Sequence, residues 1–297
     1  MEYCRSVFVR ESDGEIRKVS PEQGEFNTPC VDPTGRDAVC QGYANGSLGL
    51  WRLSLGEEHA EQLTPAHTVA LMPAYSWDGS AIVFSSDGGS GSGPKTMADF
   101  FTWPPPAHIC LNVFVMDLAT GQSRQITSGA YHDYRPSFSP DGSRIVFSSD
   151  RGGRMQLWSV PADGRSEPQR LQEAGWGMRP WFSRDGHTVF FHTEVDGRHR
   201  ICRIDAAGGE FVPLSNDYRG MSHGVFALPQ EDCLLMHSSR GGGCAIWRLP
   251  LDGAEPTRVE TRGFRIAGHA TQAKTEVMTF DSTQESPSVE PPQEDRA

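Results

Sequence analysis

The sequence predicts an all-β fold: a six-bladed β-propeller with four antiparallel strands in each blade. A repeat of about 44 residues runs along the chain, and six glycine turns can be counted independently of it. The 297 residues include 32 Gly and 21 Pro, and only 37% are hydrophobic. This composition is typical of a chain made of many short strands and tight turns.

The repeat is clearest between Arg135 and Gly153, where Ser139-Pro140-Asp141-Gly142 is followed by an apolar run. Similar segments begin at Met72 and Arg179, and a weaker one begins at Thr28. The turn glycines of these copies are Gly35, Gly79, Gly142 and Gly186, which are 44, 63 and 44 residues apart. The long interval equals one period plus an insertion of 19 residues.

Each unit contains four short predicted strands. The Asp-Gly turn joins the first two, because its positive φ angles favour these residues. A third strand leads through a second glycine turn into the fourth. These second turns lie at Gly14, Gly56, Gly121, Gly164, Gly208 and Gly253. Six second turns predict six units, each of propeller-blade length.

The sixth unit is split between the two ends of the chain. Residues 269–281 supply its two inner strands, and residues 7–10 and 15–19 supply its two outer strands. Closing the ring in this way removes unpaired strand edges. We therefore expect one propeller over residues 1–282, followed by an acidic tail, 283–297, that is too poor in apolar residues to fold.

Charge and cysteine usage exclude several classes of protein. The net charge of −11 argues against a nucleic-acid partner, which needs a clustered basic surface. No apolar run is long enough for a membrane helix, and the first residues do not resemble an export signal. The seven cysteines are scattered singly, without a CxxC pair. We expect a cytoplasmic protein with reduced thiols that mostly pack as small hydrophobes.

The insertion, residues 88–110, lies in the loop between the second and third strands of the second unit. It starts with a Gly- and Ser-rich stretch and continues through Phe100, Phe101 and Trp103 to a run of prolines. A long loop of this composition is typical of a lid or binding loop. A surface loop that has simply lengthened is the alternative.

Residues that serve only the fold should recur from blade to blade, so departures from the repeat indicate function. Arginine and aromatic residues break the repeat in the links between blades and in the inserted loop. The predicted ligand-binding residues are Arg135, Arg179, Arg265, Tyr134, Trp176 and Trp103. Such side chains suit an anionic or ring-shaped ligand.

Three histidines lie near the starts of innermost strands, where side chains can converge on the channel mouth. They are His132, His223 and His269, and Gln272 follows on the strand of His269. Three imidazoles and one amide oxygen could bind a divalent cation with positions left open. Taken singly, each histidine is more often a hydrogen-bonded structural residue.

The segment from Ser139 to Asp150 closely resembles the PD40 repeat of TolB, the Tricorn protease propeller and oligogalacturonate lyases. The resemblance extends over essentially the whole chain and implies the propeller fold, which many unrelated activities share. Similarity to oligogalacturonate lyases implies a divalent metal, such as manganese, that acidifies a C–H bond beside a substrate carboxylate. Those enzymes have seven blades, and no ligand motif aligns residue by residue.

Two functions remain open at this point. The first is a binding module for an anionic small molecule, a saccharide, or a protein or peptide. The second is a lyase that acts on uronate oligosaccharides with manganese, calcium or zinc. Metal analysis of the purified protein would distinguish them.

Overall fold

The computed structural model describes residues 5–10, 13–44, 46–57, 59–91, 109–214, 222–227, 232–239, 245–259, 266–272 and 278–283. In 5, 222–225, 227, 266–272 and 278–283 this description covers the backbone alone. Among these residues no helix is long and apolar enough to cross a membrane. The tail after residue 283, whose disorder the sequence predicts, lies outside the described residues.

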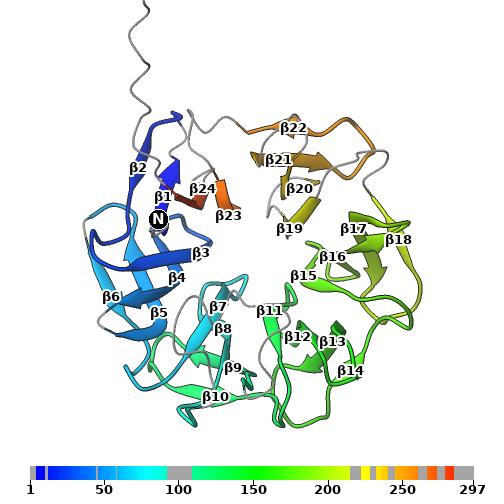
Figure 1. Cartoon of the computed structure of the whole chain (residues 1–297), viewed down its shortest axis with the longest axis horizontal. Coiled ribbons are helices and arrows are strands. Elements are labelled where there is room, and N and C mark those ends of the chain that lie inside the picture. Colours follow the sequence, from blue (N-terminus) through cyan, green and yellow to red (C-terminus); the bar gives the residue numbers. More distant parts are fainter. Residues whose placement is uncertain are drawn as a thin grey trace, which may run out of the picture.

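The described strands form six four-stranded antiparallel sheets, which we call blades 1 to 6 (Figure 1). Blade 1 contains β3 (Glu25–Val31), β4 (Asp37–Ala44), β5 (Ser47–Ser54) and β6 (Ala60–Gln62). Blade 2 contains β7 (Ala70–Tyr75), β8 (Ala81–Ser86), β9 (Asn112–Asp117) and β10 (Ser123–Gln125). Blade 3 contains β11 (Tyr134–Phe138), β12 (Arg144–Ser149), β13 (Gln156–Pro161) and β14 (Gln169–Arg170).

The other three blades complete the set. Blade 4 contains β15 (Met178–Phe182), β16 (Thr188–Val195), β17 (Arg198–Asp205) and β18 (Phe211–Pro213). Blade 5 contains β19 (Ser222–Ala227), β20 (Cys233–Ser238), β21 (Ala245–Pro250) and β22 (Thr257–Arg258). Blade 6 contains β23 (Ile266–Gln272), β24 (Met278–Thr283), β1 (Arg5–Arg10) and β2 (Ile16–Lys18).

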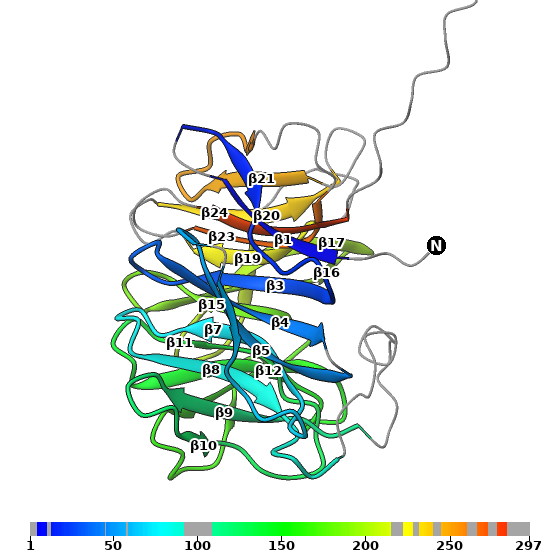
Figure 2. The ribbon, with the colours of Figure 1, turned by 90° about the vertical axis from the view of Figure 1, so that its left-hand side faces the viewer.

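The blades are arranged around a centre, with the first strand of each innermost (Figure 1). Each blade contacts the next along the chain, and β23 of blade 6 contacts both β20 of blade 5 and β3 of blade 1. Seen from the side, the strands run across the thickness of the ring (Figure 2). The prediction of an all-β propeller made of antiparallel strands is confirmed.

Blade 6 combines strands from the two ends of the sequence. Strand β1 pairs antiparallel with β24, and Phe8 lies opposite Phe280 in this register. Val7, Phe8 and Val9 are buried. The N-terminal strand is therefore an integral part of a sheet whose inner strands come from the other end of the chain.

The Asp-Gly turns are stabilised by a repeated set of hydrogen bonds. In blade 3, Ser139 Oγ donates to Asp141 Oδ1 over 2.5 Å, and the Ser143 amide donates to the same oxygen over 3.1 Å. Gly142 has a φ of 70°, a conformation that glycine adopts without strain. Blades 2 and 4 repeat the arrangement around Asp78 and Asp185. The recurring sequence motif is thus explained by turn geometry alone.

The core lies between neighbouring sheets and consists of the apolar side chains that alternate along each strand. Phe84, Phe147 and Phe191 are fully buried within it. Burial raises the pKa of the Cys30 thiol, and also that of Cys202, to about 12. These two thiols therefore pack as small hydrophobes and stay protonated at neutral pH.

Candidate functional site

One side of the ring carries the links between blades, and we call it the link face. In blade 3, Tyr134 at the start of β11 lies opposite Ser148 near the end of β12, and Ser149 lies opposite Gln156 at the start of β13. The link into the blade and the turn between its second and third strands therefore open on the same side. Differences in sequence among the links and among these turns show which blades depart from the repeat.

Each inner strand contains a β-bulge close to the link face. In blades 1 to 4 the bulge contains a non-glycine residue with a φ between 51° and 58°. These residues are Thr28, Met72, Arg135 and Arg179. Such a conformation costs of order 1 kcal/mol or more for a residue with a Cβ, so it persists only where surrounding contacts impose it.

Hydrogen bonds between neighbouring blades are among the contacts that impose this positive φ. The amide of Met72 in blade 2 donates to Gln41 Oε1 of blade 1 over 2.9 Å. The amide of Arg179 in blade 4 donates to Ser148 Oγ of blade 3 over 3.1 Å. Both acceptors lie opposite the residue just before the bulge of their own blade. The positive φ thus directs a backbone N–H across the boundary between blades.

The two predicted arginines, Arg135 and Arg179, occupy equivalent bulge positions on adjacent inner strands, since β11 contacts β15. Both are half-buried, whereas Thr28 and Met72 at the same position are buried. The structure therefore brings these two residues to the same level of the ring in neighbouring blades. A guanidinium is not needed to form the bulge, because Thr28 and Met72 form it too.

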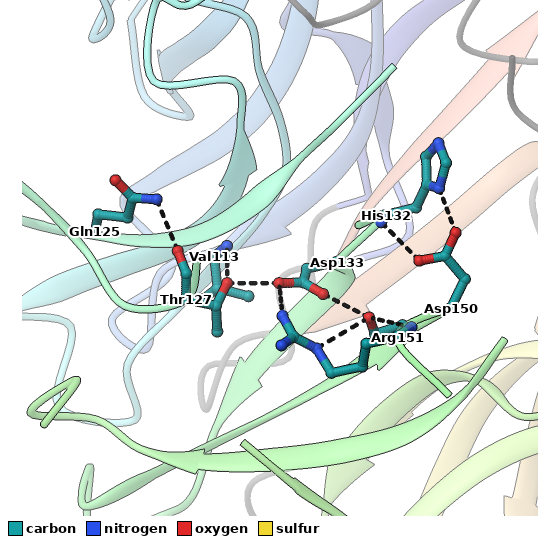
Figure 3. Close-up of polar contacts among 8 residues, drawn as sticks. Val113, Gln125, Thr127, His132, Asp133, Asp150 and Arg151 are labelled. Carbon is teal, nitrogen blue, oxygen red and sulfur yellow. Dashed lines mark hydrogen bonds and ion pairs between the residues drawn. The ribbon is translucent and has the colours of Figure 1, made fainter. Parts of the chain in front are cut away.

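His132 precedes β11 and is bound to Asp150 of the same blade. Its amide donates to Asp150 Oδ1 over 2.9 Å, and its Nδ1 lies 2.5 Å from Asp150 Oδ2 (Figure 3). Burial acts to raise the pKa of Asp150, but the hydrogen bonds from His132 outweigh it and the pKa lies below its usual value. Asp150 is thus a carboxylate at neutral pH, and His132 Nδ1 donates to it.

Next to this pair lies a buried ionic cluster centred on Asp133 (Figure 3). Asp133 accepts from Arg151 Nη2 over 2.6 Å, from Ser149 Oγ over 2.6 Å and from Thr127 Oγ1 over 2.5 Å. Burial raises the pKa of Asp133, and the Arg151 guanidinium and the two hydroxyls oppose this effect. Thr127 lies after β10 of blade 2, at the start of the link, and Asp133 lies at its end. The cluster therefore connects both ends of this link to Ser149 and Arg151 of blade 3.

Aromatic rings surround the Arg151 guanidinium. Its carbon lies 4.6 Å from the ring centre of Tyr131, 5.6 Å from that of Phe147 and 5.8 Å from that of Trp158. Tyr131 is 36% exposed. A Cβ on Gly129 would approach the Tyr131 ring to 2.6 Å, so glycine at 129 permits this ring position. The Arg151 guanidinium is therefore engaged by residues of the protein itself, and it supports the exposed ring of Tyr131.

The two predicted aromatic residues of the described links, Tyr134 and Trp176, lie in different environments. The Tyr134 ring is nearly parallel to the His132 ring, with centres 6.0 Å apart, and burial raises the pKa of its phenol. Trp176 is half-buried and makes edge contacts with the rings of His192 and His199, whose centres lie 5.2 and 5.5 Å from the Trp176 ring centre. Tyr134 stays neutral, and Trp176 belongs to an imidazole-rich group in blade 4.

The described part of the insertion begins at a capping aspartate and ends beside His132. Asp87 caps the first end by accepting from the amides of Gly89 and Gly91. At the second end, Leu111 is buried and forms a parallel bridge with His132. Residues 92–108, including Trp103, lie outside the described residues, so the predicted lid stays a prediction.

The predicted metal ligands do not share one position in the repeat. His132 precedes its strand, His223 is the second residue of β19, and His269 and Gln272 lie further along β23. The side chains of the last three lie outside the description, as does Arg265. Among the described side chains, no group of three His, Cys, Asp or Glu residues could hold a metal ion. The four-residue metal set stays a prediction.

Asp150, Asp133 and Arg151 were not predicted from the sequence. Asp150 ends the repeated Ser-Ser-Asp segment, and Asp87 in blade 2 also accepts from a link amide, that of Val69, over 3.0 Å. A repeated residue carries no functional signal. The residues that differ between the two blades, His132 in place of Val69 and Asp133 in place of Ala70, are the signal that could have identified the cluster.

Comparison with known proteins agrees with this architecture. Residues 108–218 match the family model described as the TolB beta propeller domain, PD40. An uncharacterized protein of Agrobacterium fabrum, Atu1656, is 32% identical over 114 residues, which are 38% of this chain and 33% of that protein. The Tol-Pal system protein TolB of Nitrosomonas europaea is 39% identical over 64 residues, 22% of this chain and 15% of TolB.

Solved structures match over nearly the whole chain. The structure of a putative TolB from Agrobacterium tumefaciens has a TM-score of 0.74 at 16% identity, over 95% of this chain and 99% of that one. An oligogalacturonate lyase in complex with manganese has a TM-score of 0.63 at 13% identity, over 95% of this chain and 83% of that one. The likeness to these structures concerns the propeller fold, and the match to the PD40 family model is confined to residues 108–218.

Proposed function

We propose that this protein is a ligand-binding propeller whose link face, at blades 3 and 4, binds an anionic small molecule, saccharide or peptide. The observation that supports it is the equivalent placement of Arg135 and Arg179 on adjacent inner strands. Guanidinium groups bind carboxylates and phosphates through two parallel hydrogen bonds, so a pair of them suits an anion. The bulge itself forms with uncharged Thr28 or Met72 in blades 1 and 2.

His132 is the second element of the proposed site. Asp150 fixes the orientation of its ring and favours the tautomer with the proton on Nδ1. In that tautomer Nε2 is the accepting nitrogen, and on protonation it becomes a donor. Because His132 is buried, a ligand would reach this atom only if neighbouring side chains of the link face moved.

A closed ring would keep these groups in fixed positions. We infer that pairing of β1 with β24 closes the six sheets into one six-bladed propeller. A rigid scaffold reduces the entropy lost when a ligand binds, which favours affinity. Neither arginine lies in blade 6, so closure affects the site only through the packing of successive blades.

The lyase alternative needs a metal centre, and only His132 of the four predicted ligands has a described side chain. His132 donates through Nδ1 to Asp150, which leaves Nε2 as the metal-binding atom, and no third His, Cys, Asp or Glu of the described part joins this pair. We therefore derive no metal-dependent step. A lyase remains what the resemblance to oligogalacturonate lyases implies, and manganese binding tests it.

The test is a thermal-shift titration with three probes: galacturonate oligosaccharides, short acidic peptides and simple dicarboxylates. A ligand at 100 times its Kd stabilises the folded state by about 2.7 kcal/mol. We expect one probe class to raise the Tm, and Arg135→Met and Arg179→Met each to remove most of the shift.

Arg165→Met is the control, because Arg165 is exposed in the turn after β13, on the opposite side of the ring. Its shift should equal that of the wild type. Equal shifts in all three variants would contradict the proposed site. A Tm increase with manganese alone that His132→Ala abolishes would favour the lyase.

A further inference from the structure

Asn27 is a polar residue at a position that is apolar or aromatic in blades 2 to 4. It lies in β3 just before the bulge, where blades 2, 3 and 4 have Leu71, Tyr134 and Met178. Its side chain is fully buried. The fold does not require an amide at this position, so the reason for Asn27 must lie in its surroundings.

Gln41 faces Asn27 across the first strand pair of blade 1. Residues opposite each other in an antiparallel pair project to the same side of the sheet. Gln41 Oε1 accepts from the Met72 amide over 2.9 Å, so both side chains face blade 2. This hydrogen bond also fixes the orientation of the Gln41 amide, because it identifies the oxygen. The Nε2 group must therefore point the other way.

Three buried polar atoms at this place have no hydrogen-bond partner among the described residues: Asn27 Oδ1, Asn27 Nδ2 and Gln41 Nε2. Native proteins leave few such atoms unpaired, and each calls for an explanation such as a bound water or ion. Because the two amide groups face the same boundary between blades, the simplest explanation is one partner that both of them share.

The described residues of blade 2 supply no partner across this boundary. Ala70 stands where blade 3 has Asp133, and it packs in one apolar cluster with Leu50 and Val39 of blade 1. The next hydroxyl along the boundary, Ser86 Oγ, already donates to the Val69 carbonyl over 2.7 Å and accepts from the Gly88 amide over 3.0 Å. With only the methyl group of Ala70 at this position, the unpaired amide atoms find no partner among the described residues.

The chemistry of the three atoms selects the occupant. Gln41 Nε2 donates, so a metal cation is disfavoured there. An anion could accept from Nε2 and from Asn27 Nδ2, but would leave Asn27 Oδ1 unpaired. Water both donates and accepts, and buried waters typically make about three hydrogen bonds to such groups. We propose that ordered water, at least one molecule, bridges Asn27 and Gln41 between blades 1 and 2.

A crystal structure of the wild-type protein at about 1.5 Å tests this directly. We expect density for water within about 2.7–3.2 Å of Gln41 Nε2 and of an Asn27 amide atom. A direct hydrogen bond between the two amides, or side chains turned to other partners with no water between them, would overturn the proposal.

Asn27→Leu provides a second test, because leucine is the residue of blade 2 at this position. With bridging water, the variant displaces it and leaves Gln41 Nε2 unpaired, so the Tm should fall by about 2–4 °C or more. If the amides were unpaired in the wild type, the same change would remove a buried polar group and raise the Tm. Met178→Leu, at the equivalent apolar position of blade 4, is the control and should change the Tm little.

Discussion

The amide of Arg179 in blade 4 donates to Ser148 Oγ of blade 3 over 3.1 Å, and this bond joins the two blades where their inner strands bulge. Met72 and Gln41 make the same connection between blades 2 and 1 over 2.9 Å. In each case a residue with positive φ supplies the donor. The strained conformation is thus linked to a contact between blades.

Ser148→Ala should lower the free energy of unfolding by about 1–3 kcal/mol, because the half-buried Arg179 amide loses its acceptor. Ser85→Ala is the matched control, since Ser85 is the equivalent buried residue of blade 2 and its Oγ has no hydrogen-bond partner among the described residues. Urea denaturation of both variants measures the difference. Equal losses would show that the contact between blades contributes little.

The repeat allowed the all-β propeller and its turns to be predicted, because glycine and aspartate at fixed spacing report backbone geometry. Asp141 and Gly142 are examples: their roles follow from the turn that they form. Arg135 and Arg179 were identified as departures from the repeat, but their positive φ angles were not, since bulges have no sequence signal beyond the proline that follows.

The polar contacts around His132 could not be predicted for a different reason. Asp150 occupies a repeated position, so its bond to the imidazole looks like part of the fold. Arg151 and Asp133 are 18 residues apart, and their pairing depends on how the link passes over blade 3. Partners of this kind are set by tertiary structure. Sequence spacing alone does not reveal them.

Asp133 and Arg151 should be strongly coupled. Arg151→Met leaves a buried carboxylate without its counter-charge, and we expect a loss of about 3–5 kcal/mol in unfolding free energy. Asp133→Ala should also destabilise. The double variant should lose clearly less than the sum of the two, because blade 2 folds with Ala70 and Gly88 at these positions. Additive losses in a double-mutant cycle would contradict the coupling.

Deleting residues 1–20 should unfold or aggregate the whole protein, because it removes β1 and β2 from blade 6 and exposes the edge of β24. Deleting residues 284–297, which follow β24, should leave the Tm unchanged. Thermal denaturation and size-exclusion chromatography of the two deletions provide the comparison. Wild-type melting of the first deletion would show that the ring does not depend on the N-terminal strands.

Acid should weaken the Asp-Gly turns in a defined pH range. Hydrogen bonds from Ser139 and Ser143 lower the pKa of Asp141 to about 2, and hydrogen bonds led by Ser76 and Ser183 lower the pKa of Asp78 and of Asp185. A carboxyl whose pKa is lower in the folded state stabilises the fold above its unfolded pKa, near 3.8. That contribution should disappear as the pH falls from about 4 to about 2.

The variant in which Asp78, Asp141 and Asp185 are all replaced by Asn cannot lose this contribution on protonation. Its unfolding free energy, measured by urea denaturation at several pH values, should therefore depend less on pH between about 4 and about 2 than that of the wild type. Glu173→Gln, an exposed acidic residue in the link before β15, should keep the wild-type pH dependence. Parallel pH profiles for the triple variant and the wild type would show that the turn carboxylates do not control acid stability.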